Sequence, residues 1–421
     1  MKVQIEKGET LGGRVKVISS KSVLHRLLIM SALADKKTTI SYSCKLSKDV
    51  LATIDCLTSA GSEIVVNEEK EIIEVTPLKI SKEKFTINCK ESGSTLRFIL
   101  PVFCALGLNF EVLVEGRLSS RPLSPLYEIL VLNGVKMSEN GVYPLSVSGK
   151  LDLKEVQING NVSSQFISGL LMASAILGGG KIKVLPPFES KPYVYITTEV
   201  MSYFGVKVAE YKDEFEVDKT KIISPKVIDA EGDWSNGGFL LSLGALVSKV
   251  EIVGLKSAST QGDREIARLL SLFGTKVEKG EKLYVAEKGE LNGQVIDASL
   301  IPDLVPILAV VGAVSKGRTE IVNAGRLRLK ESDRISSVVN MINSLGGRAE
   351  ERSDGIVIRG VERLKGGVVN SFNDHRIVMA SAIACAKCDE CVIIENANAV
   401  DKSYPEFFEV LKDLGFKVKE I

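Results

Sequence analysis

Histidine is scarce in this sequence: 421 residues include only His25 and His375. Cys385, Cys388 and Cys391 have a spacing that resembles that of metal ligands, but no histidine or fourth cysteine lies near them. A metal or iron–sulfur centre is therefore not expected. The seven cysteines are an odd number without a disulfide framework, which favours a reducing compartment.

Long apolar runs are also missing. The most apolar stretches, residues 166–180 and 301–314, are too short to span a bilayer or are interrupted by Asp303 and prolines. The first 13 residues contain no apolar segment of the kind found in signal peptides. We therefore expect a soluble, cytoplasmic protein.

Neither sign of charge is in excess. The 54 lysines and arginines against 53 acidic residues give a net charge of +1, so nothing global indicates a nucleic acid or a membrane surface as partner. The P-loop, GxGxxG, GxSxG and HExxH motifs are absent as well, which leaves ATP, NAD, an esterase triad and a zinc protease site without support. Any anion-binding site must be local.

A repeat of about 70 residues fills the chain. A helical segment that ends at a glycine, followed by a short strand pattern, recurs six times with spacings of 73, 71, 69, 72 and 69 residues. Each glycine suits the left-handed position after a helix. The six are Gly61, Gly134, Gly205, Gly274, Gly346 and Gly415.

A second helix-to-strand pattern recurs between these glycines, so each unit holds two helices and several short strands. The three clustered cysteines fall at this recurrent turn, which favours a structural role for them. Units of this size are large for a solenoid and more plausibly form two compact domains of three. The boundary after the third unit falls near residues 227–234.

Cations gather at the predicted helix starts of successive units. Serine, aspartate and asparagine at such positions are ordinary caps. Lysine and arginine there oppose the helix dipole, at a cost of ~0.3–1 kcal/mol each unless an anion joins them. Nine cations in equivalent places therefore favour a shared polyanionic ligand. They are Lys21, Arg26, Arg97, Arg121, Lys191, Lys330, Arg334, Arg376 and Lys402.

Other residues at the helix starts extend this candidate site. Gly93 allows close approach of a ligand to the backbone, and Ser163, Ser164 and Gln165 offer neutral donors. His375 lies between an acid and an arginine and is a site candidate, whereas His25 suits a structural role. Acidic side chains among the cations either orient them or transfer protons. They are Asp49, Asp303, Glu331 and Asp333.

Ten short motifs resemble those of the 5-enolpyruvylshikimate-3-phosphate synthase family, in the same order, from Lys21 to Phe408. The motifs are SKSVLHR, ESGSTLRF, the pair Arg121 and Pro122, SSQFISGLLMA, SKPY, GDWS, PDLVP, RLKESDR, NDHRIVMA and DKSYPEFF. The related transferase that acts on UDP-N-acetylglucosamine usually has a reactive cysteine before its Arg-Pro pair, and this chain has none there.

The resemblance implies an α/β chain with a two-domain enolpyruvyl transferase-like fold: six βαβαββ repeats, three per domain, with the active site in the interdomain cleft. One domain would comprise residues 1–19 and 231–421, and the other residues 20–230. The implied reaction transfers the enolpyruvyl group of phosphoenolpyruvate to the 5-hydroxyl of shikimate 3-phosphate, in the pathway to chorismate and aromatic amino acids. No metal or other cofactor is implied, and we expect a monomer.

The resemblance also assigns residues to the two substrates, each of which carries a phosphate and a carboxylate. Shikimate 3-phosphate would contact Lys21, Ser22, Arg26, Ser163, Ser164, Gln165, Ser190, Asp303 and Lys330. Phosphoenolpyruvate would contact Lys21, Gly93, Arg121, Gln165, Arg334, Arg376 and Lys402. The catalytic set would comprise Asp303, Glu331, Lys21, Lys330 and His375.

Asp303 would take the 5-hydroxyl proton, while Glu331 or a lysine protonates the methylene carbon. Glu91, Ser94 and Arg326 depart from the family's commoner residues, and Arg326 stands where asparagine is frequent. Two alternatives remain open: a carboxyvinyltransferase with another acceptor, and a non-catalytic anion-binding or RNA-end-processing protein built on the same repeat.

Overall fold

The computed structural model describes residues 1–80 and 83–421, which divide into two compact units. Unit 1 comprises Met1–Ile18 and Glu231–Ile421, and unit 2 comprises Ser19–Ala230. Among the helices of the described ranges, none has the length and apolar character that a membrane span requires.

Each repeat follows the order strand, helix, strand, helix, strand, strand. In the second repeat, β6 (Phe85–Asn88) pairs in parallel with β7 (Phe110–Leu113), and helix α3 (Gly93–Leu106) connects them. Strand β9 (Leu145–Gly149) pairs antiparallel with β7 and with β8 (Val135–Met137). Within the described residues this pattern forms six four-stranded sheets, which confirms the predicted α/β fold.

The remaining elements of unit 2 are α1 (Lys21–Leu33), β3 (Thr38–Ser41), α2 (Lys48–Ser59), β4 (Glu63–Asn67), β5 (Ile72–Thr76), η1 (Gly116–Ser120), α4 (Leu126–Leu132), β10 (Glu155–Asn159), α5 (Ser164–Leu177), β11 (Gly180–Leu185), α6 (Lys191–Tyr203), β12 (Val208–Tyr211), β13 (Glu214–Val217) and β14 (Val227–Asp229).

The elements of unit 1 are β1 (Lys2–Lys7), β2 (Gly13–Lys16), α7 (Trp234–Leu246), β15 (Lys249–Val253), η2 (Gly262–Glu265), α8 (Ile266–Phe273), β16 (Lys276–Lys279), β17 (Leu283–Glu287), β18 (Val295–Asp297), α9 (Val305–Ala313), β19 (Arg318–Val322), η3 (Gly325–Leu329), α10 (Arg334–Ser344), β20 (Arg348–Arg352), β21 (Gly355–Arg359), β22 (Gly367–Asn370), α11 (His375–Ala384), η4 (Cys385–Lys387), β23 (Val392–Glu395), η5 (Ala397–Lys402), α12 (Phe407–Asp413) and β24 (Phe416–Glu420).

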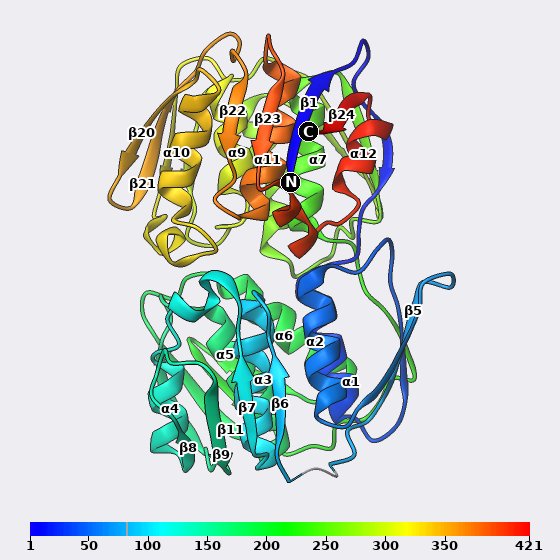
Figure 1. Cartoon of the computed structure of the whole chain (residues 1–421), viewed down its shortest axis with the longest axis vertical. Coiled ribbons are helices and arrows are strands. Elements are labelled where there is room, and N and C mark those ends of the chain that lie inside the picture. Colours follow the sequence, from blue (N-terminus) through cyan, green and yellow to red (C-terminus); the bar gives the residue numbers. More distant parts are fainter. Residues whose placement is uncertain (81–82) are drawn as a thin grey trace. The chain divides into compact units, whose positions relative to one another are not determined.

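Three repeats are completed by strands from distant parts of the chain. Strand β14, which follows the third repeat, pairs in parallel with β3 and so supplies the first strand of the first repeat. Strand β2 does the same for the fourth repeat through β15. In the sixth repeat β1, blue in Figure 1, lies between β23 and β24 and pairs antiparallel with both.

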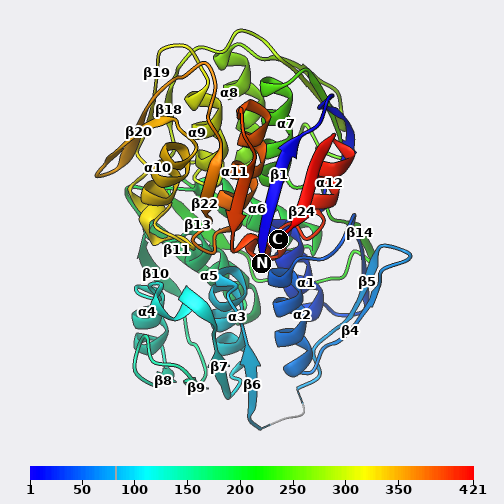
Figure 2. The same ribbon diagram turned by 45° about the horizontal axis from the view of Figure 1, so that its top comes forward.

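The first helix of each repeat lies inside its unit. In unit 1, α7, α9 and α11 lie side by side (Figure 2) and pack against one another. Every residue of these three helices is buried. Helices that are apolar all round need such an interior position. The second helices, such as α10, keep an exposed polar face. The inner helices therefore begin at positions that a buried core fixes rigidly.

The six glycines that end the repeated helices all adopt the predicted left-handed conformation. Their φ angles run from 77° at Gly205 to 112° at Gly274. An L-residue with a side chain rarely adopts such an angle, which explains why the pattern was readable from the sequence.

Some second helices begin later than the sequence pattern predicted. Arg121 follows the 3₁₀ helix η1, five residues before α4 begins, and Lys402 ends η5, five residues before α12. Lys330 likewise follows η3 and precedes α10 by four residues. A 3₁₀ helix thus ends at or just before each of these cations, and a short irregular segment separates Arg121 and Lys402 from the α-helix that follows.

Candidate active site

In unit 2, Lys21 begins α1 and opposes its dipole, but it is paired. Its Nζ lies 2.7 Å from Asp49 Oδ2, and both side chains are largely buried. Asp49 lies in the first turn of α2, where a negative charge is favourable. The acid thus orients a lysine that would otherwise be an unfavourable first residue.

Arg26 is a buried guanidinium held by neutral acceptors. It donates to Ser22 O at 2.6 Å, Thr197 Oγ1 at 2.6 Å, Ser168 Oγ at 3.2 Å and Tyr193 O at 2.9 Å. These contacts tie α1 to α5 and α6 and use four of the five N–H groups of an arginine. Burial lowers the pKa of Arg26 to about 9. In the described chain no carboxylate pairs with it, so a nearby anion would stabilise it.

The starts of α3 and α5 are linked by an arginine and an amide. Arg97 Nη1 donates to Gln165 Oε1 at 2.8 Å, and Gln165 Nε2 donates to Ser94 Oγ at 2.8 Å. Gly93 has no side chain to block this corner: a Cβ there would lie 2.8 Å from Arg121 Nη1. The guanidinium of Arg121 can therefore lie against the first residues of α3.

Three serines complete the helix starts of the third repeat. Ser163 caps α5 by accepting from the N–H of Gln165 at 3.3 Å, and Ser164 is the first residue of the helix. Ser190 precedes Lys191 in the left-handed region with φ of 52° and is 1% exposed. Within the described residues its Oγ has no hydrogen-bond partner. A buried hydroxyl in that state suits a ligand oxygen.

His25, for which the sequence indicated a structural role, lies inside unit 2. His25 is fully buried, with Nδ1 2.7 Å from Thr53 Oγ1. Burial, together with Lys21 and Arg26, lowers the pKa of His25 well below its ordinary value. A neutral imidazole in this position joins α1 to α2.

Asp303, two residues before α9, is the centre of the cluster in unit 1. Its Oδ1 accepts from Arg334 Nη1 at 2.7 Å and from Lys330 Nζ at 3.5 Å, and its Oδ2 lies 3.4 Å from Arg376 Nη2. Burial alone would raise the pKa of Asp303, but Lys330, Arg376 and Arg334 outweigh it and hold the pKa well below the usual range. The structure thus holds Asp303 as an ionised acceptor.

Lys330 has a pKa that lies closer to neutral pH than that of an ordinary lysine. Burial lowers its pKa to about 8, and Arg326 and Arg334 add to this, although Asp303 and Glu331 act in the opposite direction. A lysine that titrates near neutral pH can hold or release a proton during a reaction. Arg326, to which the sequence assigned no role, is thus one of the cations that lower the pKa of Lys330.

Arg334 is the most buried cation of the cluster. It is 1% exposed and pairs with three carboxylates: Asp303 at 2.7 Å, Glu331 at 2.7 Å and Asp374 at 2.8 Å. Glu331 is 22% exposed and so is the acid of this set that water or a ligand reaches most easily. Asp374 also accepts from Arg376 N at the start of α11.

Arg376, His375 and Lys402 border the same cluster. Arg376 Nη1 lies 3.3 Å from Asn236 Oδ1, and its guanidinium lies over the ring of Phe239 at 5.7 Å. His375 is 2% exposed. Lys402 Nζ donates to Asn373 O at 2.8 Å. The predicted residues of unit 1 are thus joined through Asp303 and the start of α11.

Comparison with known proteins identifies the family. A family model described as EPSP synthase (3-phosphoshikimate 1-carboxyvinyltransferase) matches residues 5–411. The 3-phosphoshikimate 1-carboxyvinyltransferase of Clostridium novyi is 42% identical over 424 residues and is aligned over 97% of each chain. This chain belongs to the EPSP synthase family. The family and the transferase class predicted from the ten motifs are therefore confirmed.

The fold of this EPSP synthase family member matches solved structures. The EPSP synthase of Acinetobacter baumannii has a TM-score of 0.81 at 24% identity, with 100% of both chains covered. The enolpyruvyl transferase NikO of Streptomyces tendae has a TM-score of 0.77 at 15% identity, covering 99% of this chain and 98% of that one.

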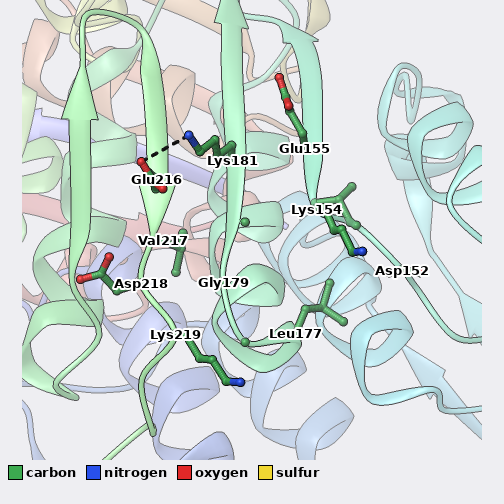
Figure 3. A pocket seen from close by; sticks show the side chains of 13 residues that line it. Asp152, Lys154, Glu155, Leu177, Gly179, Lys181, Glu216, Val217, Asp218 and Lys219 are labelled. Carbon is green, nitrogen blue, oxygen red and sulfur yellow. Dashed lines mark ion pairs between the residues drawn. The ribbon is translucent and has the colours of Figure 1, made fainter.

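A depression of about 600 Å³ in unit 2 contains none of the predicted residues. It lies where α5 ends, between β10, β11 and β13, and acids and lysines alternate around it (Figure 3). Lys181 and Glu216 form an ion pair across it at 3.6 Å. The helix-start residues of this family member are therefore not among the residues that line this depression.

Sequence reasoning missed four buried polar residues of unit 1: Asp374, Asn236, Ser235 and Asp263. Asp374 stood in the motif beside His375 and was readable as a helix cap, a role that it also has. Asp263 lies just before the second helix of the fourth repeat, in η2. Its equivalence to the cation-bearing helix starts of the other repeats could have marked it as a candidate.

Proposed function

We propose that the chain transfers the enolpyruvyl group of phosphoenolpyruvate to the 5-hydroxyl of shikimate 3-phosphate and releases inorganic phosphate. The observation that carries the proposal is the setting of Asp303, an ionised carboxylate in contact with Arg334, Lys330 and Arg376 within an EPSP synthase family chain. Such a group can accept a hydroxyl proton beside cations that bind anionic substrates.

The substrate assignments remain as the motifs predicted. We propose that shikimate 3-phosphate contacts Lys21, Ser22, Arg26, Ser163, Ser164, Gln165, Ser190, Asp303 and Lys330. We propose that phosphoenolpyruvate contacts Lys21, Gly93, Arg121, Gln165, Arg334, Arg376 and Lys402. The buried guanidinium of Arg26, surrounded by neutral acceptors, supports an anion at its remaining N–H group.

The chemical steps follow from these roles. Asp303 accepts the 5-hydroxyl proton as that oxygen bonds to C2 of phosphoenolpyruvate, and Glu331 or Lys330 protonates the methylene carbon. The methyl group of the resulting tetrahedral intermediate returns a proton to the deprotonated Glu331 or Lys330 as phosphate leaves, which restores the double bond. Arg334 balances the phosphoenolpyruvate charge while it is itself fixed by Asp374.

The proposal is tested by measuring the inorganic phosphate that is released when the protein is mixed with both substrates. We expect release that requires both compounds and that falls to background in Asp303→Asn. Absence of release in either order of addition would contradict the proposal. Offering UDP-N-acetylglucosamine instead of shikimate 3-phosphate tests the alternative acceptor in the same assay.

We also propose that the chain acts as a cytoplasmic monomer with two domains that correspond to units 1 and 2. One chain supplies every residue of the proposed site. None of the seven cysteines, all of which lie in the described ranges, forms a disulfide. Light scattering of the purified protein at assay concentration tests the monomer.

A further inference from the structure

Lys191 is a predicted site cation that the motifs assigned to neither substrate. It is the first residue of α6, where its charge opposes the helix dipole. Its Nζ lies 2.7 Å from Glu210 Oε1 and 3.1 Å from Asp213 Oδ1. Glu210 belongs to β12, and Asp213 lies in the turn that joins β12 to β13. The lysine therefore ties the start of α6 to the β12–β13 hairpin.

Two aromatic rings complete the surroundings of Lys191. Its Nζ lies 5.3 Å from the ring centroid of Phe188 and 5.8 Å from that of Tyr195, both within the range of a cation–π contact. The hydroxyl of Tyr195 donates to Glu210 Oε1 at 3.4 Å. Although partial burial alone would lower the pKa of Lys191, its hydrogen bonds to Glu210 and Asp213 raise the pKa above the ordinary value. An anionic ligand at Nζ would lie beside two carboxylates, whose repulsion disfavours it.

The start of α6 also supports two features of the proposed shikimate 3-phosphate site. Ser190, directly before Lys191, is left-handed, and its buried hydroxyl has no hydrogen-bond partner within the described residues. A residue with a side chain keeps that conformation only where its surroundings fix it. The first two turns of α6 supply two acceptors of Arg26: Tyr193 O at 2.9 Å and Thr197 Oγ1 at 2.6 Å. Lys191 thus anchors the segment on which both Ser190 and Arg26 depend.

We propose that Lys191 is a positioning residue for shikimate 3-phosphate, which it does not contact. Held by Glu210 and Asp213, it fixes the start of α6 and so places the hydroxyl of Ser190 and the guanidinium of Arg26 for the substrate. The inference rests on the proposed function. It departs from the sequence interpretation, in which Lys191 was one of the cations that share a polyanionic ligand.

Removing the charge of Lys191 should weaken the binding of one substrate. We expect Lys191→Met to raise the KM and the calorimetric Kd of shikimate 3-phosphate by roughly three- to 30-fold. At saturating shikimate 3-phosphate, kcat and the KM of phosphoenolpyruvate should stay close to those of the wild type, because only ground-state binding is lost. Lys191→Arg keeps the charge and should restore most of the affinity. Lys181→Met is the matched control with unchanged constants, since Lys181 pairs with Glu216 at 3.6 Å within the same sheet.

The two acids distinguish positioning from direct contact. Glu210→Gln combined with Asp213→Asn leaves Lys191 charged but removes its ion pairs. If Lys191 positions α6, this double variant should lose affinity for shikimate 3-phosphate by a similar factor, and adding Lys191→Met should cost little more. If Lys191 instead contacts the substrate, the loss of two repelling carboxylates should tighten binding. Unchanged or tighter binding in the double variant would overturn the inference, as would unchanged binding in Lys191→Met. The double variant decides the matter if Lys191→Met does not fold.

Hydrogen exchange tests the anchoring of α6 without a substrate. The amide of Tyr193 donates to Ser190 O at 3.0 Å in the first turn of the helix. Its exchange should be faster in Lys191→Met and in the double acid variant than in the wild type, and unchanged in Lys181→Met. Equal exchange in all four proteins would contradict the inference. A wild type that does not bind shikimate 3-phosphate, or binds it and releases no phosphate, would instead contradict the proposed function.

Discussion

The two units hold their buried cations in different ways. In unit 2, Arg26 donates to two backbone oxygens and two hydroxyls, whereas in unit 1 Arg334 pairs with three carboxylates. Lys21 with Asp49, and Lys191 with Glu210 and Asp213, are exceptions in unit 2. A guanidinium among neutral groups leaves charge for an anionic ligand, while a guanidinium among acids holds those acids ionised. Unit 2 is thus suited to binding and unit 1 to proton transfer.

The units also differ in how the chain builds them. Unit 2 is one continuous segment, and β14 at its end completes its first sheet. Unit 1 needs residues 1–18, because β1 is an inner strand between β23 and β24 and β2 pairs with β15. The first unit therefore depends on pairing between the two ends of the chain.

The largest expected effect comes from cutting the chain at these boundaries. We expect the fragment 19–230 to fold alone, with cooperative urea unfolding, because all of its sheets are complete. The fragment 231–421 should fail to fold, since β24 loses the only strand with which it pairs and β23 loses one of its two partners. Adding residues 1–18 through a short linker to the second fragment is the matched control. A cooperative transition in 231–421 alone would contradict this account.

Replacing the base should have the next largest effect. We expect Asp303→Asn to lower kcat roughly 100- to 10,000-fold, because a general base contributes by that amount. Binding of shikimate 3-phosphate, measured by calorimetry, should change far less. Asp333→Asn is the control: Asp333 caps α10, and asparagine caps equally well. A kcat for Asp303→Asn within about tenfold of the wild type would remove Asp303 from the catalytic role.

Because Arg334 and Arg26 have different partners, their replacement should lower the free energy of unfolding by different amounts. We expect Arg334→Met to lower the free energy of unfolding by about 3–5 kcal/mol, because it leaves buried carboxylates without a counter-charge. Arg26→Met should cost about 1–3 kcal/mol for the acceptors left without donors. The Arg334→Met loss should shrink as pH falls and the carboxylates take up protons, and the Arg26→Met loss should not. Equal pH dependence of both losses in urea unfolding would break the comparison.

Local signals carried most of what the sequence predicted correctly. Glycines such as Gly205 punctuate the repeats because the backbone angle after a helix excludes other residues. Strand exchange was beyond such signals, since the pairing of β14 with β3 joins residues that are far apart in the chain. The partners of Arg334 were hidden for a related reason: Asp374 looks like a helix cap and is one, and only the fold shows that it also holds an arginine.

The smallest expected effect is the uptake of a fraction of a proton when shikimate 3-phosphate binds. The pKa of Lys330 is lowered to about 8, so near that pH part of the population is neutral. A bound phosphate or carboxylate favours the charged form and raises the pKa, so binding of shikimate 3-phosphate should take up protons. Calorimetry at about pH 8 in two buffers of different ionisation enthalpy measures this uptake.

Two lysine variants test whether Lys330 is the group that takes up the proton. The arginine of Lys330→Arg stays charged, so this variant should take up no proton. Lys316→Arg is the control: Lys316 is exposed and paired with Glu290, so its replacement should leave the uptake unchanged. Proton uptake that persists in Lys330→Arg would show that another cation titrates. Arg26, with its pKa of about 9, is the next group to test. If Arg26 takes up the proton, both substrate binding and proton exchange belong to unit 2.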